Sequence, residues 1–217
     1  MESTQQLLYK EREPRVKIDS GNPLLILLHG RGTDENDLLG LASYLDERLH
    51  IVSARAPFQF QWGPGYAWYD IEEVGKPDVE KFPRSRDLIV NLIDSLRQKK
   101  AGIGKRTFLL GFSMGAVMAY AVALSHPEKV NGVIAHSGYI AEGDNTGYRW
   151  EEAKSVEFFI AHGKADPVIP VQFGQRADEL MKQHAMNYTY KEYPFAHQIS
   201  EESLHAFSGW LKQRIEL

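Results

Sequence analysis

The sequence predicts an α/β protein whose mainly parallel sheet is covered by helices on both faces. Short apolar runs of strand length alternate along the chain with longer segments of helical periodicity. The run Leu24–Leu28 is wholly aliphatic and stands between Pro23 and a His29-Gly30 pair. Such a run is typical of a strand buried on both faces of a sheet. Strands that alternate with helices form parallel sheets, because the connecting helices pack on the two faces.

Each predicted strand is short and bounded by residues that favour turns. Besides the first run, the strand pattern occurs at Ile51–Ser53, Thr107–Leu110, Val130–Ala135, Phe158–Ala161 and Tyr188–Tyr193. The last of these is rich in residues that favour strands and alternates along its length. Ligands of open α/β sheets bind beyond the carboxyl ends of the strands, so the residues that follow each run are the first candidates for a site.

Segments with apolar residues at helical spacing lie between the strands. They are Asn36–Leu49, Arg84–Lys100, Met114–Ser125, Val171–His184 and Glu201–Ile215. Two long stretches break the alternation, the aromatic Pro57–Pro83 and the polar Ser137–Lys154, and we expect both to be functional loops. No repeat or linker interrupts the chain, so we expect residues 1–217 to form one domain.

Composition excludes several classes of function. The formal net charge is −4 and no basic stripe is present, so binding to nucleic acid is not expected. The chain has no cysteine, which excludes disulfides, thiolate metal sites and a cysteine nucleophile. Residues 1–15 carry charges where a signal peptide needs an apolar stretch, and the longest aliphatic run is too short to span a bilayer. We therefore expect a cytoplasmic protein without stable membrane anchoring.

The segment Gly111-Phe-Ser113-Met-Gly115 matches the G-x-S-x-G pattern of a nucleophilic serine. A predicted strand precedes it and an alanine-rich predicted helix follows it. Ser113 would sit on a sharp turn that projects its hydroxyl above the sheet, where a side chain at position 111 or 115 would collide with the neighbouring strand and helix. The alternative is a serine that only caps the helix, but a cap does not require glycine on both flanks. The segment predicts an α/β-hydrolase fold with Ser113 as nucleophile.

A serine hydroxyl needs a base to accept its proton and a carboxylate to orient that base. In the α/β-hydrolase fold these partners follow the serine in the order acid, then histidine. Asp166 follows the strand Phe158–Ala161, and His197 follows the last strand. Each has an alternative interpretation, Asp166 as a turn residue before Pro167 and His197 as a solvated loop histidine. Their joint occurrence after different strands favours a Ser113–His197–Asp166 triad.

The negative charge that develops on a carbonyl oxygen requires preplaced hydrogen-bond donors. One predicted donor is the backbone N–H of Met114, which also begins a helix whose dipole favours anions. The second is the backbone N–H of Arg31, in a turn shaped by Gly30 and Gly32 after the first buried strand. The alternative for that segment is a simple glycine turn.

Four motifs together resemble the phospholipase/carboxylesterase family, which includes bacterial carboxylesterases and acyl-protein thioesterases. They are His29-Gly-Arg-Gly, Gly111-Phe-Ser-Met-Gly-Ala, His162-Gly-x-x-Asp-Pro-Val-Ile-Pro and Tyr193-Pro-x-x-His197. The resemblance runs from about residue 23 to the C-terminus. It implies an α/β-hydrolase with a minimal lid, no cofactor, and hydrolysis of carboxylic esters, with thioesters and lysophospholipids as further candidate substrates.

The same resemblance places Trp68 and Tyr69 near the pocket, and two departures from the family pattern bear on the substrate. Arg31 stands where the family often has leucine, and His136 stands where an aliphatic residue is more usual. A charged side chain at position 31 would narrow the pocket or meet a polar substrate. Both departures argue against a long-chain lipid substrate.

The aromatic stretch Pro57–Pro83 is the predicted pocket wall, since ligand sites are mostly apolar. The residues expected to contact substrate are Gly30, Gly32, Trp68, Tyr69 and Phe195. Alternatively, the rings of the stretch cap the core or form a homodimer contact. The expected partner is a small ester or thioester.

Two other classes of function remain open. One is a metal-dependent hydrolase that uses the histidines following predicted strands, His29, His136, His162 and His197, together with Asp166. The sequence has no H-E-x-x-H motif or other closely paired histidines, so we expect no metal. The other is a ligand receptor on a hydrolase fold, which has no need of a complete triad.

Overall fold

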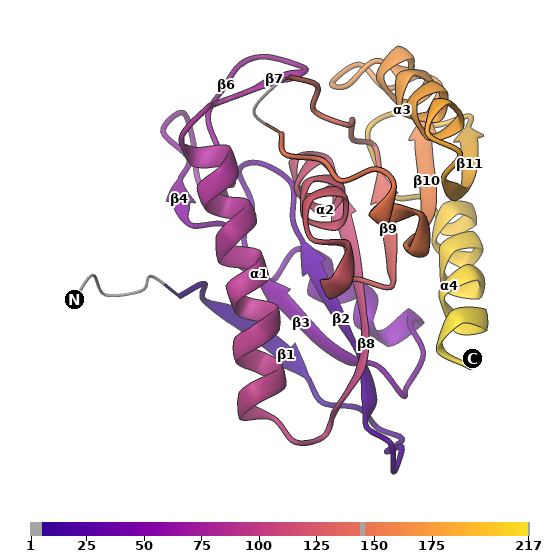
Figure 1. Cartoon of the computed structure of the whole chain (residues 1–217). Coiled ribbons are helices and arrows are strands. Elements are labelled where there is room, and N and C mark those ends of the chain that lie inside the picture. The colour runs from indigo at the N-terminus through magenta and orange to yellow at the C-terminus, as the bar shows by residue number, and fades with distance from the viewer. Residues whose placement is uncertain (1–5, 144–145, 217) are drawn as a thin grey trace.

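The computed structural model describes residues 6–143 and 146–216, which are arranged around one seven-stranded sheet (Figure 1). The strand order is β1-β3-β2-β8-β9-β10-β11, and only β1 runs antiparallel to its neighbour. The strands are β1 (Tyr9–Arg12), β2 (Asn22–Leu28), β3 (His50–Ala54), β8 (Ile103–Phe112), β9 (Gly132–His136), β10 (Glu157–Gly163) and β11 (Asn187–Tyr193). The prediction of a mainly parallel α/β-hydrolase sheet is confirmed.

Helices cover both faces of the sheet. Alternate residues of β2 enter different apolar clusters, Leu24, Ile26 and Leu28 on one face and Leu25 and Leu27 on the other. The first face is covered by α1 (Lys81–Lys99), α2 (Met114–Ser125) and α3 (Val171–Gln183). The second is covered by α4 (Glu201–Ile215) and the short 3-10 helix η1 (Leu38–Tyr44). All residues of β2 are buried, as its aliphatic sequence predicts.

The predicted helix over Asn36–Leu49 is wrong, because only η1 forms there. Leu45 is extended, and the Asp46 carboxylate then accepts the Arg48 backbone amide at 2.9 Å, which closes a turn in place of a helical turn. Leu38, Leu45 and Leu49 are buried nonetheless, and Leu39 and Leu41 are half-buried against the same cluster. Their spacing therefore reflected burial against the sheet and not helical structure.

The aromatic stretch Pro57–Pro83 contains regular structure that the sequence did not predict. One hairpin joins β4 (Phe58–Gln59) to β5 (Tyr66–Ala67), and a second joins β6 (Ile71–Glu73) to β7 (Lys76–Pro77). Figure 1 shows the β6–β7 hairpin at the end of the molecule toward which β9 and β10 point. At the end of the second irregular stretch, the 3-10 helix η3 (Glu152–Ser155) precedes β10. A further 3-10 helix, η2 (Pro127–Lys129), lies outside that stretch and precedes β9.

None of the helices in the described part of the chain is both long enough and apolar enough to cross a bilayer.

Candidate active site

Ser113 occupies a strained turn between β8 and α2. Its backbone has φ 55° and ψ −120°, a conformation that costs a non-glycine residue about 1–3 kcal/mol. Its N–H donates to the His136 carbonyl at 2.9 Å, which ties the turn to the end of β9. The Ser113 side chain makes no capping hydrogen bond to α2. The turn therefore holds a half-buried hydroxyl that does not cap the helix, contrary to the alternative interpretation.

The two glycines of the motif are required by close backbone contacts. A Cβ atom on Gly111 would lie 2.2 Å from the Gly115 carbonyl oxygen, and one on Gly115 would lie 1.9 Å from the Leu28 carbonyl oxygen. Both distances are far inside van der Waals contact, and the obstructing atoms are backbone atoms that cannot swing away. The glycines let α2 begin directly against β2 and β8, which places Ser113 above the carboxyl edge of the sheet.

Asp166 and His197 meet at the same edge. The Nδ1 atom of His197 lies 2.7 Å from the Oδ2 atom of Asp166. The other carboxylate oxygen of Asp166 accepts the backbone amides of Val168 and Ile169, each at 2.9 Å. The Asp166 side chain is fully buried, whereas the His197 side chain is 15% exposed. A buried carboxylate fixed by two amides can orient the partly exposed imidazole and leave its Nε2 atom facing outward.

The loops that carry these two residues are joined by their backbones. Lys164 donates its amide to the Tyr193 carbonyl at 2.8 Å, and Ala165 donates to the Phe195 carbonyl at 3.1 Å. A Cβ atom on Gly163 would lie 2.3 Å from the Ala196 carbonyl oxygen. Glycine at the end of β10 thus allows the segment before His197 to lie directly on the segment before Asp166.

Ser113 is linked to His197 through Phe112. The Phe112 and His197 rings are 4.9 Å apart between centroids, so the imidazole lies beside the residue that precedes the serine. Within residues 6–143 and 146–216, the Ser113 hydroxyl makes no hydrogen bond, to His197 or to any other group. Catalytic hydrogen bonds are often long without substrate and shorten in the complex.

The predicted oxyanion donors border the serine. A Cβ atom on Gly30 would lie 3.5 Å from the Ser113 Cβ atom, so the turn after β2 touches the nucleophile. Gly32 has φ +82°, which favours glycine, and its amide donates to the Tyr66 carbonyl at 2.9 Å. In the described part of the chain, the amides of Arg31 and Met114 have no intramolecular acceptor. Both are therefore available to an external oxygen.

Trp68 and Tyr69 do not lie on an open pocket wall. Their residues are 0% and 1% exposed. The Trp68 indole N–H donates to the His29 carbonyl at 2.9 Å, and the Trp68 amide donates to the Met114 sulfur at 3.2 Å. Trp68 thus holds the His29-Gly30 turn after β2 in place through this hydrogen bond. The Tyr69 hydroxyl lies 3.1 Å from the Tyr139 hydroxyl. These contacts describe support for the site, and direct contact with substrate stays a prediction.

A cavity at the same edge involves residues that sequence reasoning missed. Its volume is about 180 Å³, and it is lined by Gly75, Tyr139, Ile140, Glu142, Gln172, Phe173 and Arg176. Gly138, which precedes Tyr139 in the chain, lies close to the backbone of the Ser113 turn, since a Cβ atom there would lie 3.0 Å from the Ser113 carbonyl oxygen. Of the predicted aromatic wall, only Gly75 reaches this cavity. Tyr139 follows the end of β9, so the strand-end position was the signal that could have identified it.

The histidines that follow the strands each have hydrogen-bond partners of their own, and His162 Nε2 also lies 3.6 Å from Asp166 Oδ2. His29 accepts the Ala56 amide at 3.0 Å and donates to the Gly30 carbonyl at 2.6 Å. His136 lies between the hydroxyls of Ser137 and Ser203, each at 3.0 Å. His162 donates to the Ile169 carbonyl at 2.8 Å. Burial lowers the pKa of all three, that of His136 to about 3, so these rings are held in the neutral form.

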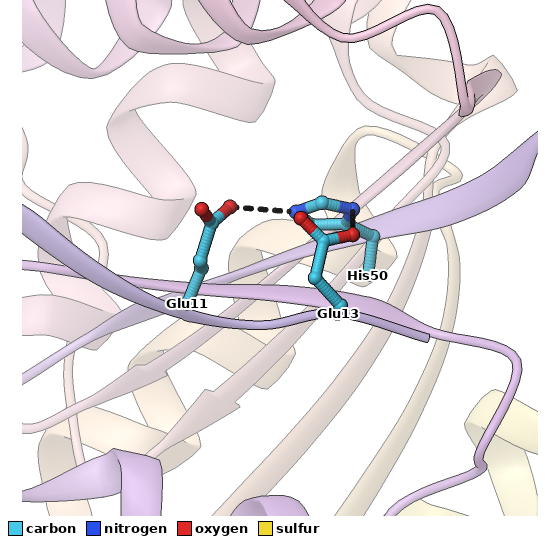
Figure 2. A group of neighbouring side chains, drawn as sticks. All are labelled: Glu11, Glu13 and His50. Carbon is cyan, nitrogen blue, oxygen red and sulfur yellow. Dashed lines mark hydrogen bonds and ion pairs between the residues drawn. The ribbon is translucent and has the colours of Figure 1, made fainter. Parts of the chain in front are cut away.

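Side-chain atoms that are close enough together to bind one metal ion lie outside the candidate active site. In the described part of the chain, only Glu11, Glu13 and His50 form such a group (Figure 2). The two ring nitrogens of His50 face different carboxylates, Nε2 at 2.9 Å from Glu11 and Nδ1 at 3.4 Å from Glu13. Lys100 pairs with both acids at 2.9 Å and 3.3 Å. This is an ion-pair cluster that fastens β1 to β3, and the strand-end histidines with Asp166 do not form a comparable group.

Comparison with known proteins agrees with this geometry. A model of the phospholipase/carboxylesterase family matches residues 15–215. The chain is 26% identical to acyl-protein thioesterase 1 of Kluyveromyces lactis, over 93% of this chain and 96% of that protein. It is 30% identical to acyl-protein thioesterase 1 of Emericella nidulans, over 79% of this chain and 81% of that protein. The Bacillus cereus carboxylesterase structure superposes with a TM-score of 0.82 at 20% identity, over 97% of this chain and 96% of the other.

The fold and the matched family define an α/β serine hydrolase that acts on carboxylic esters or thioesters. The chain belongs to the phospholipase/carboxylesterase family. The interpretations as a metal-dependent hydrolase or a non-catalytic receptor are not favoured by these relatives.

Proposed function

We propose that Ser113, His197 and Asp166 form the catalytic triad of this hydrolase. The observation that carries the proposal is the 2.7 Å contact between His197 Nδ1 and the buried Asp166 carboxylate, beside the strained Ser113 turn. The contact fixes the tautomer in which Nδ1 is protonated and Nε2 is free to act as a base. A surface histidine without such a partner would have no fixed orientation.

In the proposed reaction the Ser113 oxygen attacks the acyl carbonyl while His197 Nε2 takes the serine proton. The tetrahedral intermediate collapses when His197 gives that proton to the leaving alcohol or thiol, which leaves an acyl-enzyme on Ser113. Water then attacks the acyl carbon, His197 takes a proton from the water, and the acid is released as the serine is reprotonated. Asp166 steadies the imidazolium in both half-reactions.

The Arg31 and Met114 amides are the proposed oxyanion donors. Both lie beside Ser113 without an internal acceptor, and Met114 begins α2, where the helix dipole favours negative charge. Loss of one such donor reduces kcat about a hundredfold to a thousandfold in serine hydrolases. Because both donors are backbone groups, they act whatever side chain stands at positions 31 and 114.

The proposed substrates are small esters or thioesters. The cavity lined by Tyr139, which we assign to the acyl chain, is about 180 Å³, which is smaller than the roughly 300–1,000 Å³ of typical ligand pockets. Its size favours a short acyl chain, to be tested with nitrophenyl esters of increasing acyl length. Action on protein-linked thioesters or on lysophospholipid esters stays a prediction. A cytoplasmic location and a homodimer also stay predictions.

The triad is tested by Ser113→Ala. We expect ester hydrolysis to fall by several orders of magnitude with an unchanged circular dichroism spectrum, and labelling by a fluorophosphonate probe to disappear. Ser43→Ala, at an exposed serine on η1, is the matched control and should keep both activity and labelling. Full activity in the Ser113 variant, or a probe adduct mapped to another residue, would refute the assignment.

A further inference from the structure

We propose that the Arg31 side chain selects substrates that carry an anionic group, a carboxylate or a phosphate, near the scissile ester or thioester. The inference rests on the proposed function of Ser113. Arg31 follows Gly30, which lies beside Ser113: a Cβ atom on Gly30 would lie 3.5 Å from the Ser113 Cβ atom. The long side chain of Arg31 therefore begins at the border of the reacting site.

The Arg31 guanidinium has no counter-ion among residues 6–143 and 146–216. The residue is exposed, and in the described part of the chain its side chain makes no hydrogen bond or ion pair. It contacts the Phe60 ring, whose centroid lies 5.4 Å from Arg31 Cζ. Such a contact orients a guanidinium without neutralising it. Phe60 in turn is placed by the same turn, since a Cβ atom on Gly32 would lie 3.6 Å from its ring.

The acidic residues that follow this turn are engaged with other partners. The Glu35 carboxylate binds Arg55 through two contacts of 2.5 Å and 2.6 Å. Asp34 accepts the Asn36 backbone amide at 2.8 Å, and Asp37 accepts the Thr33 hydroxyl at 3.1 Å. None of the three pairs with Arg31, so the positive charge stays available for a ligand.

The positive charge of Arg31 acts on two tyrosines, one of which lines the cavity. Burial raises the pKa of Tyr69 and of Tyr139, and the nearby Arg31 charge opposes the rise in both. Tyr139 lines the cavity of about 180 Å³. The cation that lines this cavity, Arg176, already binds Glu142 at 2.7 Å and Glu179 at 3.1 Å. Arg31 is therefore the cation that a bound anion would meet.

An anionic substrate gains an interaction that a neutral substrate of the same shape does not. A guanidinium binds a carboxylate or phosphate through charge-assisted, often paired hydrogen bonds. At a partly solvated site this contact should raise kcat/KM for the anionic substrate about tenfold to a hundredfold relative to the neutral substrate. Lysine keeps the charge and loses the planar pair of donors, so Arg31→Lys should keep part of the preference.

The test compares kcat/KM ratios for matched substrates. In the acyl arm, nitrophenyl adipate monoester is compared with nitrophenyl hexanoate. In the leaving-group arm, the butyryl thioester of 3-mercaptopropionate is compared with the butyryl thioester of 3-mercaptopropionamide, which has the same shape without the charge. Wild type, Arg31→Gln, Arg31→Lys and Lys17→Gln are each measured on all four. Lys17 is exposed and precedes β2 at the opposite edge of the sheet, so its variant controls for the change in net charge.

We expect Arg31→Gln to lower the anionic-to-neutral ratio about tenfold or more in one arm, which also identifies the side of the substrate that carries the anion. Lys17→Gln should leave both ratios at the wild-type value. Added salt should lower the ratio of every protein that keeps a positive charge at position 31, and it should leave the ratio of Arg31→Gln unchanged. Equal ratios in wild type and Arg31→Gln in both arms would overturn the inference while the proposed function stands. If wild type hydrolyses no substrate and Ser113 is not labelled, the proposed function fails and the inference fails with it.

Discussion

The Nδ1 atom of His197 lies 2.7 Å from a carboxylate oxygen of Asp166, and the second oxygen of that carboxylate is held by the backbone amides of Val168 and Ile169. The carboxylate is thus oriented before substrate arrives. Two loops from different strands bring the pair together, and their backbones are hydrogen-bonded to each other. The imidazole is therefore placed by the rigid end of the sheet and not by a mobile side chain.

Asp166→Asn should inactivate the enzyme and preserve the fold. The asparagine oxygen can still accept the two amides, but its NH2 group would face His197 Nδ1 and favour the wrong imidazole tautomer. We expect kcat to fall on the order of ten-thousandfold, measured with a neutral nitrophenyl ester. Asp87→Asn, at an exposed acid on α1, is the control. A reduction below about tenfold would show that Asp166 does not orient the base.

Gly115→Ala should destabilise the Ser113 turn. The added methyl would lie 1.9 Å from the Leu28 carbonyl oxygen, so β2 and α2 must separate. We expect the free energy of unfolding to fall by about 1–3 kcal/mol or more, as measured by urea denaturation. We also expect a large loss of kcat, as measured by ester hydrolysis. Gly209→Ala is the matched control. Gly209 lies in α4 with open space around it, and alanine there should stabilise the helix by about 1 kcal/mol.

Much of the fold and of the proposed site could be predicted because both depend on local pattern. The aliphatic sequence of Leu24–Leu28 is that of a strand buried on both faces, and the flanking glycines of Ser113 reflect contacts with neighbouring backbone. Asp166 and His197 could be placed because each follows a strand, and parallel strands end at one edge.

Elements that depend on distant partners could not be predicted. The exposed strand Tyr9–Arg12 has no apolar alternation, and its pairing with β3 is reinforced by His50 and Lys100, which bind Glu11. The apolar residues of Pro57–Pro83 suggested a pocket wall, but Trp68 is buried beneath the His29-Gly30 turn. Composition alone does not distinguish a ring that lines a pocket from a ring that supports it.

Trp68→Phe tests the supporting role. Phenylalanine fills most of the space and removes the indole donor, which leaves the buried His29 carbonyl without that partner. We expect the free energy of unfolding to fall by about 1–3 kcal/mol and kcat to fall by up to about a hundredfold, because the oxyanion turn shifts. The control is Trp62→Phe, at a residue that is 86% exposed. If Trp68→Phe instead raised KM alone, Trp68 would contact substrate directly.

The buried histidine at the end of β9 should make stability depend on pH. Burial lowers the pKa of His136 to about 3, whereas a histidine in the unfolded chain titrates near about 6.5. Between these values the unfolded chain binds a proton that the folded chain does not, so a falling pH favours unfolding. Above about pH 7 both states are neutral at this residue, and its contribution to the pH dependence vanishes.

The expected decrease in the free energy of unfolding from His136 approaches about 1.4 kcal/mol for each pH unit below 6.5. His29 and His162, whose pKa values burial also lowers, act in the same direction. Urea denaturation at pH 5.0 and 7.5 measures the total change in the free energy of unfolding. In His136→Gln that change should be smaller, because nearly one proton fewer is taken up on unfolding at the lower pH. Glutamine suits the position because its amide can still bond to Ser137 and Ser203, the partners of the imidazole. Equal pH dependence in the two proteins would mean that His136 does not titrate on unfolding.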